Sequence, residues 1–197
     1  MKVVMRVAIP ELLRFRERTG ADRFDEMWQG VLHMTPSPSL QHQLHASRIL
    51  NFFVEVWCPR TRGAAVMQIN VSVPERWDQD YRIPDVSVML PDRVPPDERM
   101  FVRPNAVFEI RSPGDETYDK LAFYAAVGVE AVVVVERDTK ATQVFALSDG
   151  DFVLLPPGAD GWTVVRPIDV ELSSESTERG PALRLRLSGY PETERLI

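Results

Sequence analysis

The sequence predicts a mixed α/β fold in a single domain. Its 197 residues correspond to one domain, with at most a small appendage, at about 150 residues per domain. Hydrophobic residues make up 44% and charged residues 26%, a globular mixture that excludes collagen-like, coiled-coil and wholly disordered classes. Helical and strand patterns follow in the order helix, hairpin, long helix, strands, helix, strands. This order indicates central strands flanked by at least two helices.

The first third of the chain predicts two helices with a hairpin between them. Pro10 suits the first turn of a helix that ends near Gly20. The pair Gln29-Gly30 separates two partly alternating runs and is typical of a tight hairpin turn. Ser39 follows a proline-rich breaker segment and predicts the N-cap of a helix that reaches about Trp57.

The middle of the chain predicts four strands, three of which are expected to be buried. An alternating run predicts a first strand, and short apolar runs between turn signals predict three buried ones. A helical pattern precedes the last strand, and a proline-rich loop precedes the third. In chain order the segments are the strands 64–73 and 86–90, the loop 91–104, the strand 105–111, the helix 115–127 and the strand 131–136.

The last part of the chain predicts a meander of hairpins over 140–165, with turn clusters between its strands. We expect one domain to cover residues 1–170. Residues 171–197 are polar and predict a C-terminal extension. The alternation from Leu183 to Leu187 gives that extension one edge strand.

Charge and cysteine content exclude several functional classes. The net charge is −6, so the molecule is not a strongly basic nucleic-acid coat, and any contact with DNA must come from a local basic patch. The single Cys58 excludes an internal disulfide framework and predicts a reducing, cytoplasmic location. The longest apolar run, 131–135, is far shorter than the ~20 residues of a membrane span, so we expect no membrane partner.

Two acidic residues stand out because they lie in or beside apolar strands. Asp85 opens the strand 86–90, and Glu109 sits near the end of the strand 105–111. A carboxylate buried alone is costly, so such an acid is usually paired, hydrogen-bonded or bound to a cation. Because carboxylate oxygens suit Mg²⁺, the two strands could bring both acids to one ion.

Two basic residues could complete such a site. Arg111 lies two residues after Glu109, so both side chains project from the same face of the strand. The carbonyl group of Ile110 could add an oxygen ligand. Lys120 lies in the helix that follows and could reach the same pocket if that helix packs back across the sheet.

Simpler interpretations stay open for each residue. Asp85 after a proline could cap a turn. Glu109 and Arg111 could form a solvent-facing pair on an edge strand, and Lys120 could be an exposed helix lysine. His42 and the histidine three residues later share a helix face, but no third ligand is apparent nearby, which favours a surface or helix N-terminal role.

Five short runs in fixed order surround these residues, and together they resemble one family. They are Glu26-Met27-Trp28-Gln29-Gly30, Pro36-Ser37-Pro38 with His42, Arg82-Ile83-Pro84-Asp85-Val86, Phe108-Glu109-Ile110-Arg111-Ser112-Pro113, and Lys120…Tyr124…Gly128-Val129-Glu130. Each run is weak alone, but the set resembles the Uma-type restriction endonuclease family of the PD-(D/E)XK nuclease superfamily. The resemblance covers about residues 10–155.

The resemblance implies a restriction-endonuclease-like core, a mixed sheet of four to five strands with helices on either side. It also implies hydrolysis of DNA phosphodiester bonds by metal-activated water, with Mg²⁺ as cofactor and Mn²⁺ as an alternative. A homodimer is expected, because cutting both DNA strands needs two sites and twofold symmetry is the commonest way to supply them.

The resemblance also assigns roles to individual residues. Asp85 matches the metal-binding aspartate, Glu109 the second metal-binding acid, and Glu26 an additional acid of the metal site. His42 matches a family position and is expected near the pocket.

The expected catalytic cations are Arg111 and Lys120. The usual pattern has a lysine two residues after the second acid, and here that position is Arg111. Members of the family often carry the lysine on the next helix, which matches Lys120. Arg111 cannot act as a base but could stabilise phosphate charge, whereas Lys120 could position or deprotonate the attacking water.

A rival hypothesis is a catalytically inactive module on the same fold, which binds nucleic acid or protein. The missing lysine after Glu109, the acidic net charge and the lack of an evident basic recognition element favour it. A third hypothesis is hydrolysis of another phosphodiester, such as RNA.

Overall fold

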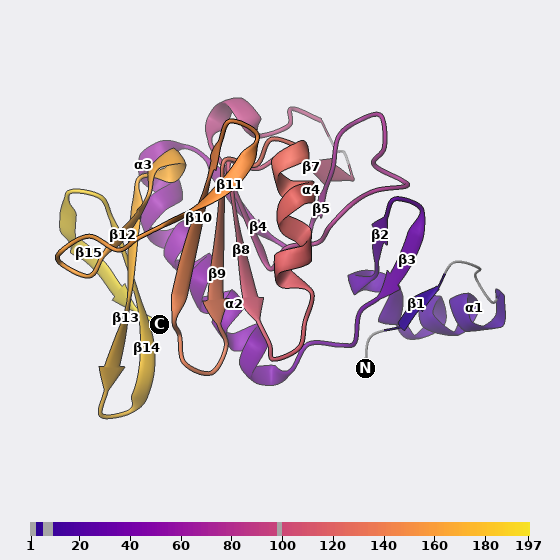
Figure 1. Cartoon of the computed structure of the whole chain (residues 1–197), viewed down its shortest axis with the longest axis horizontal. Helices are drawn as coiled ribbons and strands as arrows, with labels where there is room; N and C mark the ends of the chain where they lie inside the picture. Colours follow the sequence, from indigo (N-terminus) through magenta and orange to yellow (C-terminus); the bar gives the residue numbers. More distant parts are fainter. Residues whose placement is uncertain (1–2, 6–9, 98–99) are drawn as a thin grey trace.

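The centre of the molecule is a six-stranded mixed sheet. A computed structural model describes residues 3–5, 10–97 and 100–197. The strand order is β11-β10-β9-β8-β6-β4, and only β8 and β9 are parallel neighbours (Figure 1). The sheet confirms the α/β class, with six strands where four to five were expected. Its strands are β4 (Ala64–Met67), β6 (Val86–Met89), β8 (Ala106–Arg111), β9 (Ala131–Glu136), β10 (Thr142–Ser148) and β11 (Asp151–Leu155).

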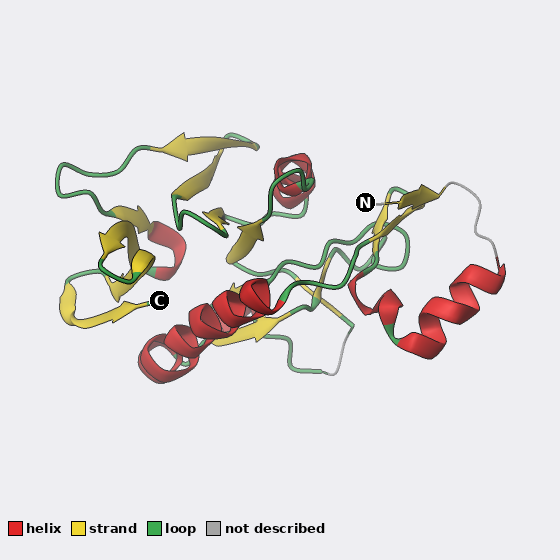
Figure 2. Ribbon diagram, turned by 90° about the horizontal axis from the view of Figure 1, so that it is seen from below, coloured by secondary structure: helices red, strands yellow, loops and turns green. Residues whose placement is uncertain are grey.

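Helices cover both faces of this sheet. Helix α2 (Leu40–Phe52) lies on one face and α4 (Leu121–Ala126) on the other (Figures 1 and 2). Ser39 caps α2 as predicted, because its hydroxyl accepts the His42 N–H at 3.3 Å. The helix continues as one π-helical turn, η2 (Phe53–Trp57), and then α3 (Cys58–Thr61). Within the described ranges, no helix is both long and apolar enough to cross a membrane.

The alternation of side chains along strand β8 determines which face of the sheet carries the acid Glu109. Ala106, Phe108 and Ile110 pack in the core on the α2 side, whereas Val107 packs on the α4 side. Because successive side chains point to opposite faces, Glu109 shares the α4 face with Val107. The sequence therefore places a carboxylate beneath the element that carries Lys120.

A short 3₁₀ turn, η4 (Thr117–Lys120), leads into α4. The helix expected over 115–127 thus begins two residues later, because Asp115 instead caps the turn. Its carboxylate accepts the Thr117 N–H at 3.0 Å and the Thr117 hydroxyl at 2.7 Å. Gly128, with φ 77°, follows the end of the helix.

The N-terminal part forms a three-stranded sheet of order β1-β3-β2. The predicted hairpin is confirmed, with Gln29 at φ 50° and Gly30 at φ 79° in the turn. The hairpin and α1 lie on the opposite side of the central sheet from the C-terminal strands (Figure 1). The elements are β1 (Val3–Met5), α1 (Pro10–Thr19), η1 (Ala21–Phe24), β2 (Glu26–Trp28) and β3 (Val31–Met34).

The prediction of one strand over 64–73 is wrong. The chain turns at Gln68, which has φ 53°, so the strand divides into β4 and β5 (Asn70–Val71). Strand β5 pairs in parallel with β7 (Phe101–Val102). The expected loop 91–104 therefore contains β7 and the short η3 (Pro91–Arg93).

The C-terminal strands form a second, antiparallel sheet, which corrects two predictions. Strand β14 pairs with neighbours on both sides, so the run from Leu183 to Leu187 is an inner strand and not an edge strand. Strand β12 belongs to this sheet and does not extend the β10–β11 hairpin. The elements are β12 (Thr163–Val165), η5 (Arg166–Ile168), β13 (Val170–Thr177), β14 (Gly180–Leu187) and β15 (Tyr190–Leu196).

Alternation of inward-facing and outward-facing side chains explains why residues 171–197 look polar in the sequence. Leu183 and Leu185 face the core and are at most 1% exposed, whereas Arg184 and Arg186, which alternate with them, face away. The same core cluster contains Phe53 and Trp57, and Trp57 Nε1 donates to the Ile168 carbonyl at 2.7 Å. The C-terminal strands thus share the core of the central sheet, and the boundary at residue 170 stays a prediction.

Candidate active site

A cavity of about 450 Å³ lies between the N-terminal hairpin, the start of α2, the strands β6 and β8, and η4. It brings together five of the six residues singled out from the sequence. These are Glu26, His42, Asp85, Glu109 and Lys120, and all five line the cavity.

Asp85 is fixed by two long-range contacts. Its Oδ2 accepts the Ile110 N–H of strand β8 at 2.7 Å, and its Oδ1 accepts His42 Nε2–H at 2.7 Å. Burial alone would lower the pKa of His42, but the hydrogen bond and charge of Asp85 raise it overall. Asp85 therefore joins β8 to α2 and does not merely cap its own turn.

Glu109 is buried, with 5% of its surface exposed. Its Oε1 accepts Lys120 Nζ–H at 3.0 Å and the Tyr124 hydroxyl at 2.6 Å. Burial is the largest effect on its pKa, which is raised to about 7 with help from the charges of Asp85 and Glu26. Lys120 and Tyr124 act in the opposite direction but do not outweigh burial. A solvent-facing role for Glu109 is therefore wrong.

Glu26, on the hairpin strand β2, is also buried and has three hydrogen-bond donors. Its Oε1 accepts the Ile83 N–H at 2.9 Å and lies 2.8 Å from Lys120 Nζ, and its Oε2 accepts Trp28 Nε1–H at 2.8 Å. Burial would raise the pKa of Glu26, but Lys120 and the other donors lower it overall. Glu26 thus ties the hairpin to the segment that leads into Asp85.

Lys120 lies between the two buried glutamates and is itself 12% exposed at the side chain. Burial would lower the pKa of Lys120, but the charges of Glu109 and Glu26 raise it above its ordinary value. The side chain therefore stays protonated. The low exposure of Lys120 excludes the exposed-lysine interpretation. Its protonated state argues against a role as the base that deprotonates water.

Arg111 does not line the cavity, so the cation beside Glu109 is Lys120 and not Arg111. Its side chain is on the predicted face, but Nη1 donates to both oxygens of Glu136, at 2.8 and 3.1 Å. The register of the parallel strands places Glu136 directly opposite. The guanidinium also lies 5.0 Å from the centroid of the Tyr118 ring.

Sequence reasoning missed Tyr124 as a partner of Glu109. Tyr124 is fully buried, and burial together with Glu109 raises its pKa well above the ordinary value, so its hydroxyl donates. Its position four residues after Lys120, on the same helix face, was the available signal. The backbone N–H groups that hold the acids leave no signal in the side-chain sequence.

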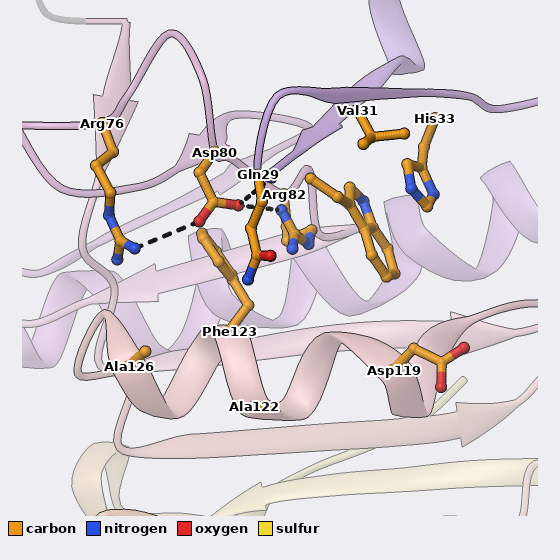
Figure 3. Close-up of a pocket in the computed structure, with 11 residues that line it drawn as sticks. Gln29, Val31, His33, Arg76, Asp80, Arg82, Asp119, Ala122, Phe123 and Ala126 are labelled. Atoms are coloured by element: carbon orange, nitrogen blue, oxygen red, sulfur yellow. Dashed lines mark hydrogen bonds and ion pairs between the residues drawn. The ribbon is translucent and has the colours of Figure 1, made fainter. Parts of the chain in front are cut away.

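A second cavity of about 440 Å³ lies between the hairpin, the segment that carries Asp80 and Arg82, and helix α4 (Figure 3). Arg82 lies in its wall, with the guanidinium carbon 4.1 Å from the ring centroids of both Trp28 and Phe123. Its Nη1 donates to Asp80 at 3.0 Å and to the Met27 carbonyl at 2.9 Å. Figure 3 shows Asp80 between Arg82 and Arg76. This buried pair supports the strand that carries Glu26.

We expect Arg82→Met to lower the free energy of unfolding by about 3 kcal/mol or more, because it leaves Asp80 buried without its closest cation. Arg76→Met is the matched control, because Arg76 contacts the same carboxylate at 3.5 Å but is 49% exposed at the side chain. An exposed pair contributes about 0–1 kcal/mol. Urea denaturation measures both, and equal losses would contradict this account of Arg82.

The fold and the cavity define a restriction-endonuclease-like α/β protein, in which acids from separate strands converge with a lysine from the following helix. The chain belongs to the Uma2 family, described as "Putative restriction endonuclease", whose family model matches residues 9–177.

One solved structure shows the same fold. It is the crystal structure of a "putative nuclease belonging to DUF820" from Anabaena variabilis ATCC 29413. The TM-score is 0.59 at 17% sequence identity, and the likeness covers 73% of this chain and 82% of that one. A comparison with curated proteins finds no match.

Proposed function

We propose that the chain is a Mg²⁺-dependent nuclease that hydrolyses phosphodiester bonds of DNA. One observation carries the proposal: Asp85 and Glu109, which are far apart in sequence, line the same cavity beside a protonated Lys120. Family membership and the likeness to a structure titled as a nuclease support the reaction class.

The chemistry of the donors fits a divalent cation. Two carboxylates and the nearby Ile110 carbonyl offer oxygen ligands, and the charge of Asp85 helps to raise the pKa of Glu109. A cation between these acids would relieve that repulsion. Among the described residues, no group of three or more histidine, cysteine or acidic side chains is placed to hold a metal, so waters would have to complete the coordination of the ion. When bound, the ion would activate water and neutralise charge on the leaving oxygen, and Mn²⁺ is an alternative.

The other residues of the cavity would position these acids and the substrate. We assign Asp85 and Glu109 to the ion and Lys120 to a non-bridging phosphate oxygen, to which its ammonium group donates a hydrogen bond. His42 orients Asp85 through the 2.7 Å hydrogen bond. Glu26 has three donors, one of them Lys120, whereas Asp85 has one donor on each oxygen, so we assign Glu26 to holding Lys120 in place of the expected metal binding.

A cleavage assay tests the proposal. The purified chain is incubated with supercoiled plasmid and with labelled DNA and RNA of the same sequence, in Mg²⁺, Mn²⁺ or EDTA. We expect nicked and linear plasmid with either metal and none with EDTA. Binding without cleavage in any metal would favour the non-catalytic module, and cleavage of RNA alone would move the substrate class to RNA.

Two further properties belong to the same proposal. We propose a homodimer, because a symmetric pair of sites would cut both strands of a duplex. We also propose a cytoplasmic location, on the ground that the chain has a single cysteine. Sedimentation of the purified chain distinguishes a dimer from a monomer.

A further inference from the structure

A cluster of cationic side chains borders the candidate active site, and the proposed function does not use it. It consists of Arg48, Arg137 and Lys140, which we call the flanking patch. We infer that the flanking patch binds the phosphate backbone of the substrate strand beside the bond to be cut. This inference rests on the proposed function and names a second surface for the same substrate.

Arg137 places the flanking patch at the same edge of the central sheet as the candidate active site. It follows the last residue of β9, and its N–H donates to the Arg111 carbonyl at the end of β8 at 3.0 Å. Strands β8 and β9 are parallel, so both end at the edge toward which Glu109 lies. Arg137 also lines the active-site cavity. A nucleic-acid strand bound over Glu109 would therefore continue past Arg137.

The turn that carries Lys140 is held in one conformation. The Lys140 N–H donates to the Glu136 carbonyl at 2.9 Å, and the Lys140 carbonyl accepts the Ser174 hydroxyl at 2.6 Å. The ammonium group donates to the Arg137 carbonyl and contacts Nε2 of the buried His45. Lys140 is 8% exposed, so it adds positive charge to the flanking patch and leaves direct phosphate contacts to Arg48 and Arg137.

Arg48 connects the flanking patch to helix α2, six residues after His42. Its side chain is exposed. Burial and then the charges of Lys140 and Arg48 lower the pKa of His45 to about 4. Burial also lowers the pKa of Lys140, and Arg137 and Arg48 act in the same direction while Asp138 opposes them. Arg48 lies three residues after His45 on α2, so it shares the helix face on which His45 contacts Lys140.

Within the flanking patch, the protein balances only part of the positive charge. Asp138 pairs with Arg137 at 2.8 and 3.0 Å. Among the residues that the structure describes, Arg48 and Lys140 have no carboxylate within the 4.0 Å of an ion pair. Adjacent like charges cost folding energy, and a phosphate backbone would compensate them. In a chain of net charge −6, this is the local basic patch that binding to DNA requires.

The dependence of binding on salt tests the inference directly. Wild type and the double variant Arg48→Gln/Arg137→Gln are titrated onto a fluorescent DNA duplex in EDTA between about 50 and 200 mM salt. Loss of two phosphate contacts should reduce the slope of log affinity against log salt by about two, equally for unrelated sequences. Arg179→Gln, an exposed arginine in the turn between β13 and β14, should leave the slope unchanged.

The outcomes separate this inference from the proposed function. An unchanged slope in the double variant, or no binding by wild type, would overturn the flanking patch. If wild type cleaves DNA in Mg²⁺ and the double variant keeps the wild-type slope, the flanking patch is overturned and the proposed nuclease stands. A patch-dependent slope without cleavage would support the patch and count against the nuclease. Duplex RNA in the same titration distinguishes the two sources of phosphate.

Discussion

Replacing Lys120 with methionine is expected to lower the free energy of unfolding by about 3–5 kcal/mol and to abolish cleavage. Lys120 is the cation within 3.0 Å of both Glu26 and Glu109, each of which is at most 5% exposed. Without it, Glu26 and Glu109 lose their closest compensating charge, and Glu109, whose pKa is already raised to about 7, would take up a proton at a cost in stability. Urea denaturation at neutral pH measures the loss of stability, and the plasmid assay measures the loss of activity.

A triple variant separates the two effects. Lys120→Met combined with Glu26→Gln and Glu109→Gln removes the unpaired charges, and each amide oxygen can still accept a hydrogen bond. We expect most of the stability to return, because a neutral polar cluster replaces the ion pairs, while cleavage stays absent. A single Lys120→Met variant as stable as wild type would show that the three side chains do not form a buried ionic cluster.

The second large effect is expected for Asp85→Asn, which should reduce the cleavage rate by at least about 100-fold. The reason is that loss of a charged metal ligand removes several kcal/mol of transition-state stabilisation. The amide oxygen can still accept the Ile110 N–H, so the fold should persist. Single-turnover cleavage in Mg²⁺ measures the rate, and circular dichroism checks the fold.

Asp149→Asn is the matched control for this prediction. Asp149 is exposed in the turn between β10 and β11 and has φ 51°, a conformation that asparagine tolerates. It should cleave at the wild-type rate. If Asp85→Asn also cleaved within about threefold of wild type, Asp85 would have no role in metal binding, because threefold is under 1 kcal/mol.

The sequence was informative where the signal was local. The apolar run around Glu109 predicted β8 and made its carboxylate conspicuous, and Gln29-Gly30 predicted the hairpin turn. The position of Asp85 before a second apolar strand predicted that both acids could meet. Each of these features depends on the residue types within one short segment, so it can be recognised from the sequence alone.

The errors arise where contacts depend on register or on a second sheet. Strand periodicity placed Arg111 on the correct face, but only the pairing of β8 with β9 puts Glu136 opposite it. The leucines of β14 look like an edge strand until β13 and β15 are known to flank it. The Ile110 N–H that holds Asp85 is a backbone group, and every residue except proline has one.

The most direct test of the account is a crystal structure of the protein soaked in Mn²⁺, with anomalous density recorded for the metal. We predict a peak in the active-site cavity, about 2.0–2.3 Å from one oxygen of Asp85 and one of Glu109, with Lys120 still between Glu109 and Glu26. A fully occupied peak at other residues, or none in the cavity at saturating Mn²⁺, would contradict the claim that these two acids share a cation.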